Sequence, residues 1–254
     1  MILCLDAGNS RLKFGLFDDS GWLLQDALDY AAFDELPARL PAMPTRIVAC
    51  NVAGEAVRLR IEALAASLAL PLGWLSSSAA TCGVTNAYDR PQQLGADRWA
   101  ALIAARAIHT GPTVVTMAGT ATTIDALDGN GLFRGGVILP GLSLMRAALA
   151  RNTADLPDAA GHYRPQPTNT DDAIVSGSIH ATLGAIGRMR ATLSDDALCL
   201  LSGGAATELA PHLDPPCRMV DNLVLEGLAR YGQPRLAIPG CSLPPNAGGR
   251  GSSR

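Results

Sequence analysis

Lysine is almost absent from this chain of 254 residues, since Lys13 is the only lysine among 20 basic residues. Aromatic residues make up 4% of the chain, so alanine and aliphatic side chains must fill the core. No apolar run approaches the roughly 18–20 residues that span a bilayer. The first residues also lack the basic segment and cleavage site of a signal peptide. We therefore expect no membrane partner and a cytoplasmic location.

Two further absences argue against nucleic-acid binding and against a structural zinc site. The net charge of −3 offers no excess of positive charge for nucleic acid, so we expect no nucleic-acid partner. The six cysteines and four histidines are scattered, without a C-x-x-C pair or another metal-binding spacing, which argues against structural zinc. What remains is a hydrophobic content of 48%, typical of a soluble α/β protein with a sizeable core.

Apolar patterning predicts strands and helices along the whole chain. Alternating or continuous apolar runs predict strands, and apolar positions three to four residues apart predict helices. The expected strands fall within residues 2–5, 12–17, 21–30, 46–54, 72–76, 113–141 (three strands) and 197–205. The expected helices fall within residues 57–70, 95–110, 142–151, 171–192 and 223–232.

The first strand pair has a partial copy later in the chain. With an offset of 111 positions, "LDAGNSRLKFGL" falls on "TMAGTATTIDAL", so that Asp6 meets Met117 and Gly8 meets Gly119. Two such hairpins, each opening one part of the chain, predict a duplicated α/β protein with a cleft between its halves. We expect the halves to span residues 1–112 and 113–235, and residues 236–254, rich in Pro, Gly and Ser, to be disordered.

Turns of this kind suit phosphate groups. Glycine lets the backbone approach a ligand closely, and backbone N–H groups with small polar side chains supply donors. The two turns match neither the Walker A motif nor G-x-G-x-x-G, so the folds that carry those motifs are not indicated. Taken alone, the first hairpin is equally consistent with an ordinary turn that has an aspartate at its tip.

Several blocks together resemble the type III pantothenate kinases, within the actin-like and sugar-kinase superfamily. The matching blocks are "DAGNSRLK" (6–13), "NAYDRPQQLGADRW" (86–99), "GTATTID" (119–125), "GGVILPG" (135–141), "TDDAIVSG" (170–177) and "LSGGA" (201–205). The resemblance implies duplicated ribonuclease-H-like (actin-like ATPase) domains, with mixed β-sheets flanked by helices and an interdomain cleft. It also implies ATP-dependent phosphorylation of pantothenate to 4'-phosphopantothenate, the first step of coenzyme A synthesis, by a homodimer whose substrate pocket uses both subunits.

The resemblance assigns roles to individual residues. Asp97 is the expected proton acceptor from the pantothenate hydroxyl, and Asp6 is the expected ligand of the Mg²⁺ that accompanies ATP. The expected ATP-binding residues are Asp6, Ala7, Gly8, Asn9, Ser10, Arg11, Leu12, Lys13 and Thr120. The expected substrate-binding residues are Tyr88, Gly95, Ala96, Asp97, Arg98 and Thr170, with Arg98 paired to the substrate carboxylate through a bidentate fork. Gly203 and Gly204 are expected near the adenosine.

Simpler roles stay open for several of these residues. Asp6 could cap its own turn, and Lys13 could lie on a solvated strand face. Asp97 is also typical of a first helical turn, where the helix dipole favours an acidic side chain. Thr170 by itself fits a helix N-cap. Asp125, beside the second hairpin, fits a strand surface as well as a metal site.

Met117 departs from the family pattern. Many members carry an aspartate there that holds a monovalent cation, K⁺ or NH4⁺, whereas a thioether is a poor ligand for a hard cation. Either activity needs no such ion, or backbone oxygens hold it, or the enzyme is impaired. The alternative functions are a non-catalytic ATP-binding regulatory protein on the same scaffold and a kinase of another small hydroxylated acid.

Overall fold

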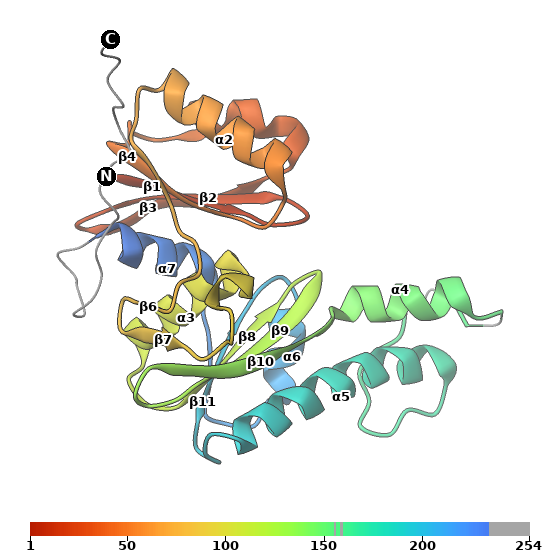
Figure 1. The fold of residues 1–254 in the computed structure, drawn as a ribbon. Coiled ribbons are helices and arrows are strands. Elements are labelled where there is room, and N and C mark those ends of the chain that lie inside the picture. Colours follow the sequence, from red (N-terminus) through yellow and green to blue (C-terminus); the bar gives the residue numbers. More distant parts are fainter. Residues whose placement is uncertain (155, 158–159, 234–254) are drawn as a thin grey trace, which may run out of the picture.

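The computed structural model describes residues 1–154, 156–157 and 160–233. The predicted disordered tail, residues 236–254, lies outside these ranges. The described chain forms two lobes, each built on a mixed β-sheet (Figure 1). In this part of the chain no helix combines the length and the hydropathy needed to cross a bilayer.

The first sheet has five strands in the order β3-β2-β1-β4-β5. Its central strand β1 is buried at all six residues, because apolar layers cover both of its faces. Leu3 and Leu5 face a cluster with α2 (Glu55–Ser67), whereas Ile2 and Cys4 face the second lobe. Since side chains alternate along a strand, Asp6 lies on the same face as Cys4, toward the second lobe. The strands are β1 (Ile2–Ala7), β2 (Leu12–Asp18), β3 (Gly21–Leu28), β4 (Arg46–Asn51) and β5 (Leu72–Trp74).

The second sheet repeats this plan and extends it. Its seven strands have the order β12-β11-β8-β9-β10-β7-β6, and the segment β10-β9-β8-β11-β12 matches β3-β2-β1-β4-β5 strand for strand. In both lobes the central strand has an antiparallel hairpin partner on one side and a parallel strand on the other. The predicted duplication is therefore confirmed. The strands are β6 (Ala80–Thr81), β7 (Val84–Asn86), β8 (Thr113–Ala118), β9 (Ala121–Leu127), β10 (Leu132–Pro140), β11 (Leu198–Ser202) and β12 (Cys217–Met219).

Strand pairing crosses the predicted division at residue 112. The short strands β6 and β7 precede that residue, yet β7 pairs in parallel with β10 of the second sheet. The division into residues 1–112 and 113–235 stays a prediction about sequence halves, and its second half extends past the described residues. Short helical segments that the patterning did not indicate are η1 (Tyr30–Glu35), α1 (Leu36–Arg39), η2 (Pro91–Gln93), α6 (Ala206–Leu209) and η3 (Ala210–His212).

Two helices lie between the sheets and join the lobes (Figure 1). Helix α7 (Leu223–Gly232) packs along α3 (Ala96–Ile108) and against β1 and β4. The approach to α3 is so close that a β-carbon at Gly227 would lie 1.9 Å from the carbonyl oxygen of Ala100. Trp22 of β3 adds a hydrogen bond of 2.7 Å from its indole N–H to Glu226. This packing sets the position of the first turn of α3, which carries Asp97.

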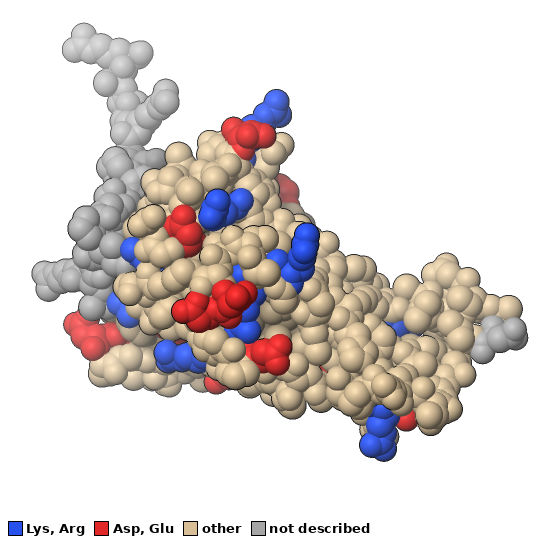
Figure 2. Space-filling view, turned by 90° about the horizontal axis from the view of Figure 1, so that it is seen from below, with Lys and Arg blue, Asp and Glu red and all other residues tan. Residues whose placement is uncertain are grey.

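An arm extends from the second lobe. It consists of α4 (Leu142–Asn152), α5 (Thr170–Ala191) and the described residues between them (Figure 1). Seen from below in Figure 2, the arm is largely uncharged, whereas acidic and basic side chains gather over the rest of this face. Exposed apolar residues follow the arm and the strand that leads into it: Val137, Ile138, Leu144 and Leu149.

Candidate active site at the two hairpin turns

The turns of the two equivalent hairpins meet. The Ser10 hydroxyl, in the β1–β2 turn, lies 2.9 Å from the Thr120 hydroxyl, in the β8–β9 turn. Both residues are exposed, as are Asn9 and Arg11. The structure therefore brings together the two turns that were predicted to hold phosphates.

The predicted ATP segment 6–13 divides into core and surface. The side chains of Ala7 and Leu12 are fully buried among apolar neighbours, so only their backbone groups can face a nucleotide. The Gly8 carbonyl accepts a hydrogen bond of 2.5 Å from the Tyr30 hydroxyl. Burial raises the pKa of Tyr30 to about 12, which keeps this hydroxyl protonated as a donor. Tyr30 thus stabilises the first turn through the backbone of Gly8.

Asp6 is a nearly buried carboxylate at the end of β1, with 6% of its surface exposed. It lies opposite Lys13 of β2 and beside Cys50 of β4, whose thiol donates to Asp6 Oδ1 at 3.6 Å. Burial raises the pKa of Asp6 to about 6; the Lys13 charge opposes that rise, and the Asp97 charge adds to it. Asp6 therefore faces the second lobe. Its side chain accepts a hydrogen bond from Cys50 rather than from its own turn.

Lys13 shares the face of Asp6. Directly opposed residues of an antiparallel pair project to the same side of the sheet, and Lys13 is only partly exposed. This position favours the predicted reach toward nucleotide phosphates over a solvated strand face. The contact with ATP itself stays a prediction.

Asp97 occupies the first turn of α3. Its Oδ1 accepts a hydrogen bond of 2.8 Å from the backbone N–H of Arg98 and lies over Gly95, where a β-carbon would come within 2.5 Å of it. Because Asp97 contributes to the raised pKa of Asp6, the two carboxylates lie within electrostatic reach of each other. The Asp97 carboxylate is half-buried and is free to accept a further bond at Oδ2.

Arg98 is buried and is already paired. Its Nε donates to Asp125 Oδ2 at 3.1 Å and its Nη2 to Asp125 Oδ1 at 2.5 Å, while Nη1 donates to the Tyr88 hydroxyl at 3.3 Å. Asp125 has no exposed surface, so a place on the strand surface is wrong, and both of its oxygens are taken by Arg98. Burial raises the pKa of Asp125, and the Arg98 guanidinium opposes that rise.

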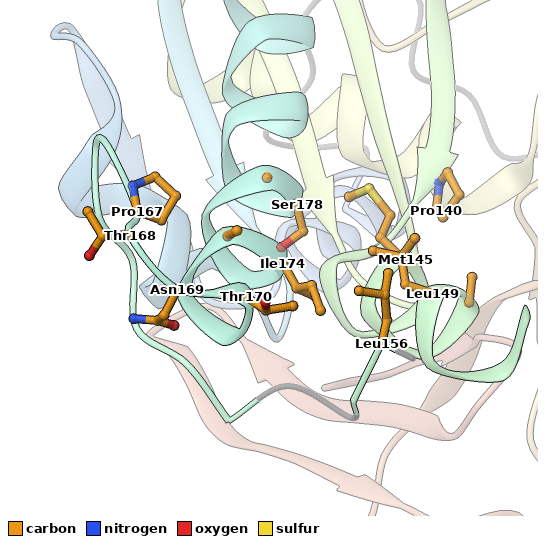
Figure 3. Close-up of a pocket in the computed structure, with 13 residues that line it drawn as sticks. Pro140, Met145, Leu149, Leu156, Pro167, Thr168, Asn169, Thr170, Ile174 and Ser178 are labelled. Carbon is orange, nitrogen blue, oxygen red and sulfur yellow. The ribbon is translucent and has the colours of Figure 1, made fainter. Parts of the chain in front are cut away.

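Thr170 lies apart from the other predicted substrate residues. The N-cap of α5 is Asn169, whose side chain accepts a hydrogen bond of 2.9 Å from the Asp172 N–H, so an N-cap role for Thr170 is wrong by one residue. Thr170 is the first helical residue and lines a pocket of about 890 Å³ between α4 and α5. Figure 3 shows Met145 and Leu149 of α4 lying toward Ile174 of α5 across this pocket.

A smaller pocket lies beside Ala96. It has a volume of about 360 Å³ and is lined at the ends of β4 and β5 by residues that include Asn51, Val52, Trp74 and Ser76. Ala96 precedes Asp97, so this pocket adjoins the predicted catalytic carboxylate. At the other lobe, the N–H of Ala205 donates to the Ala118 carbonyl at 3.0 Å, which sets the Gly203–Gly204 pair beside the second turn.

The residues fit Mg²⁺ better than they fit a monovalent cation. Magnesium is commonly bound by one or two carboxylates together with substrate phosphates, and Asp6 is one carboxylate placed beside the turns. Among the described residues no group of three or more His, Cys, Asp or Glu side chains forms a cage for a metal ion. Met117 lies between Thr123 and Ser202 in the sheet and packs on the apolar cluster between the lobes. Its thioether does not fit K⁺ or NH4⁺.

Sequence reasoning missed two residues of this site, Tyr30 and Cys50, and it missed the pairing of Asp125 with Arg98. Each acts through a contact between distant segments, which local patterning does not contain. Cys50 had a usable signal, since it lies in the strand predicted at residues 46–54, and in the sheet it stands beside Asp6 of the parallel strand β1.

Comparison with known proteins identifies the family. The profile of the type III pantothenate kinases matches residues 2–192. The chain is 50% identical to a type III pantothenate kinase of Aromatoleum aromaticum over 234 residues, covering 90% of this chain and 96% of that protein. It is 49% identical to the one of Dechloromonas aromatica, covering 90% and 97%.

Solved structures share the fold at low identity. Ethanolamine utilization protein EutJ of Carboxydothermus hydrogenoformans is 12% identical with a TM-score of 0.56, covering 91% of this chain and 89% of that one. Component A of the (R)-2-hydroxyglutaryl-CoA dehydratase of Acidaminococcus fermentans is 11% identical with a TM-score of 0.52, covering 91% and 96%. The shared fold and the repeated sheet order confirm the predicted actin-like α/β class. From its sequence profile, its relatives and the pairing of its two hairpin turns, the chain belongs to the type III pantothenate kinase family.

Proposed function

We propose that this protein transfers the γ-phosphoryl group of ATP to the primary hydroxyl of pantothenate, giving 4'-phosphopantothenate in the first step of coenzyme A synthesis. The observation that carries the proposal is the meeting of the two hairpin turns, with the nearly buried Asp6 at the end of the strand that leads into the first of them. Family membership names the substrate, because this fold hosts many activities. A cytoplasmic location belongs to the same proposal.

The chemistry asks mainly for position and charge. Phosphoryl transfer proceeds through a loose transition state, so the protein must align the nucleophile and neutralise phosphate charge. Asp6 would hold Mg²⁺ together with ATP, and the bound ion would supply part of that neutralisation. The turn residues 8–11 and Thr120 donate to phosphate oxygens, and Lys13 adds a positive charge. Asp97 accepts the hydrogen bond of the substrate hydroxyl and takes its proton.

An assay of wild type against Asp97→Asn tests the proposal. ATP and pantothenate are supplied with Mg²⁺, and phosphopantothenate is detected by mass spectrometry. We expect turnover by the wild type and a loss of about 10²–10⁴-fold in kcat for Asp97→Asn, since it removes a proton acceptor without removing its volume. Folded wild type that makes no phosphopantothenate contradicts the function. An Asp97→Asn variant of full activity contradicts only the role of Asp97.

The same assay separates the alternative functions. Met117 favours a non-catalytic regulatory protein, because it removes an expected ligand. Such a protein binds ATP and produces no phosphorylated product. A kinase of another small hydroxylated acid turns over that acid in preference to pantothenate. The intact set of Asp6, Asp97 and Arg98 argues against the non-catalytic alternative.

A homodimer belongs to the proposal. Thr170 lines a pocket that none of the other predicted substrate residues lines. Its lining includes Leu149, which is 39% exposed, and Ile138, on the strand that leads into the arm, is 64% exposed. A second copy packed on this arm buries these side chains and brings its Thr170 toward the substrate site.

Light scattering tests the dimer. We expect twice the chain mass of 26.3 kDa for the wild type and a single chain for Ile138→Glu, with loss of pantothenate turnover. Met43→Glu is the matched control, because Met43 is 61% exposed but lies outside the arm. A wild-type monomer with full activity contradicts the shared pocket.

A further inference from the structure

We propose that Asp125 is a positioning residue of the substrate site: it holds the Arg98 guanidinium by one edge and thereby aims the remaining N–H groups at the substrate carboxylate. The inference rests on the proposed function, since it concerns how the same site recognises pantothenate.

The pair has the geometry of a fixed fork. Nε and Nη2 of Arg98 donate to different oxygens of Asp125, at 3.1 and 2.5 Å. Two parallel bonds to one planar carboxylate fix both the position and the plane of the guanidinium. Arg98 is 6% exposed and Asp125 is fully buried, so water does not compete for these bonds.

The surroundings lock the pair from two further sides. The guanidinium carbon lies 6.0 Å from the Tyr88 ring centroid and 5.9 Å from that of Phe133. On β10, Gly136 lies opposite Asp125, and a β-carbon there would come within 2.0 Å of Asp125 Oδ1 and 2.7 Å of Arg98 Nη2. The strand backbone therefore packs directly on the pair, which requires glycine at this position.

The donor count leaves a free side. A guanidinium has five N–H groups. Two bind Asp125 and one binds the Tyr88 hydroxyl, so each terminal nitrogen keeps one N–H without a partner among the described residues. Arg98 directly follows Asp97, so the first turn of α3 carries both the group proposed for the substrate carboxylate and the proton acceptor proposed for its hydroxyl. Asp125 thus holds the Arg98 guanidinium in the one orientation in which its two remaining N–H groups bind a carboxylate.

A purely structural ion pair between α3 and β9 is the rival explanation. Breaking such a buried pair destabilises the fold because one charge loses its partner. That loss affects all substrates alike. A positioning role instead changes the preference between acids and neutral analogues, and this preference distinguishes the two explanations.

The experiment measures kcat/KM for pantothenate and for pantothenol, in which an alcohol replaces the carboxylate. We expect the wild type to prefer pantothenate by at least about tenfold, the effect of a hydrogen bond to a charged group. Asp125→Asn and Gly136→Ala should lose most of this preference, with the KM for ATP within about twofold of wild type. Gly187→Ala is the control, because a β-carbon there meets nothing within 4 Å.

A double variant covers the case in which Asp125→Asn fails to fold. Arg98→Met with Asp125→Leu replaces the pair by apolar side chains, which restores packing without charges. We expect it to fold and to show no preference for the acid. Variants that retain the preference, or that lose activity equally on both compounds, overturn the inference. A wild type that phosphorylates neither compound overturns the proposed function instead.

Discussion

The β1–β2 and β8–β9 hairpins occupy equivalent places in the two lobes, but their turns differ in chemistry. In each lobe the central strand lies between an antiparallel hairpin partner and a parallel neighbour. In the first lobe Asp6 has Lys13 and Cys50 as neighbours, and in the second Met117 has Thr123 and Ser202. The duplicated backbone is retained, whereas the charges are confined to the first turn.

This difference indicates a division of labour. A nearly buried carboxylate beside a lysine is suited to a metal ion and to phosphate charge. The second turn offers a hydroxyl at Thr120 and backbone groups, without a side chain for a hard cation. Four experiments test whether the two turns differ in function.

The largest effect is expected from Asp6→Ala, compared with Met117→Leu. Asp6 is the only carboxylate at its turn, so its loss should lower kcat with Mg-ATP on the order of 10³-fold. Met117→Leu conserves volume and should change kcat by less than about threefold. Steady-state kinetics with a circular dichroism check of folding measure both. Similar losses at the two positions contradict the division of labour.

The next effect is a pH dependence of the free energy of unfolding, measured on protein without ATP or Mg²⁺. The pKa of Asp6 is raised to about 6, so between pH 4 and 6 the folded chain binds more protons there than the unfolded chain. The stabilising contribution of Asp6 is therefore full below pH 4 and is lost as the pH rises through 6. Relative to Asp6→Asn, the free energy of unfolding should fall by at most about 3 kcal/mol across this range.

Chemical denaturation of wild type and Asp6→Asn at several pH values measures this difference. Using the difference cancels the opposite pH dependence of Asp18, Asp172 and Asp196, whose pKa values are lowered by hydrogen bonds. A difference that is constant between pH 4 and 7 contradicts the burial of an ionisable Asp6.

A smaller effect is expected from Met117→Asp, which makes the second strand end resemble the first. A carboxylate at this partly buried position lacks a cationic partner and should lower stability by about 1–3 kcal/mol. Added K⁺ should then raise the Tm of Met117→Asp and leave that of the wild type unchanged, measured against choline chloride at equal ionic strength. Equal K⁺ stabilisation of both proteins indicates that backbone oxygens hold the ion in the wild type.

The smallest effect is expected where the turns touch. The hydrogen bond between Ser10 and Thr120 is exposed, so Ser10→Ala and Thr120→Ala should each cost at most about 1 kcal/mol of stability. Both hydroxyls are also expected at the phosphates, so the KM for ATP should rise a few-fold in each variant. A double-mutant cycle on Tm measures the coupling. A coupling that is absent shows that the turns do not touch in solution.

Patterning in the sequence predicted the elements with strong periodicity. The helix expected at residues 223–232 has those bounds, and the three strands within residues 113–141 are β8, β9 and β10. The strands β6, β7 and β12, of two or three residues each, were missed, whereas β5, which also has three residues, was predicted from its apolar run. The pairing of β7 with β10 depends on a partner far along the chain.

The candidate site divides in the same way. Asp6, Asp97 and Arg98 stand in motifs, and their roles in catalysis and binding stay predictions. Asp125 stood in a motif as well, but its partner lies 27 residues away on another element. Its burial could not be read from strand alternation, because both faces of β9 are covered there. Side-chain pairing across elements is therefore the part of the site that sequence left open.

The packing of α3 against α7 affects the order in which the protein can fold during its synthesis. Ribosomes release the chain from its N-terminus, so residues 1–222, with all of the predicted site residues, emerge before α7 does. Until then, the apolar sides of β1 and α3 that α7 covers are exposed to water. A chain in this state exposes an apolar surface, and the packing that holds α3, which carries Asp97, is complete only when α7 has docked.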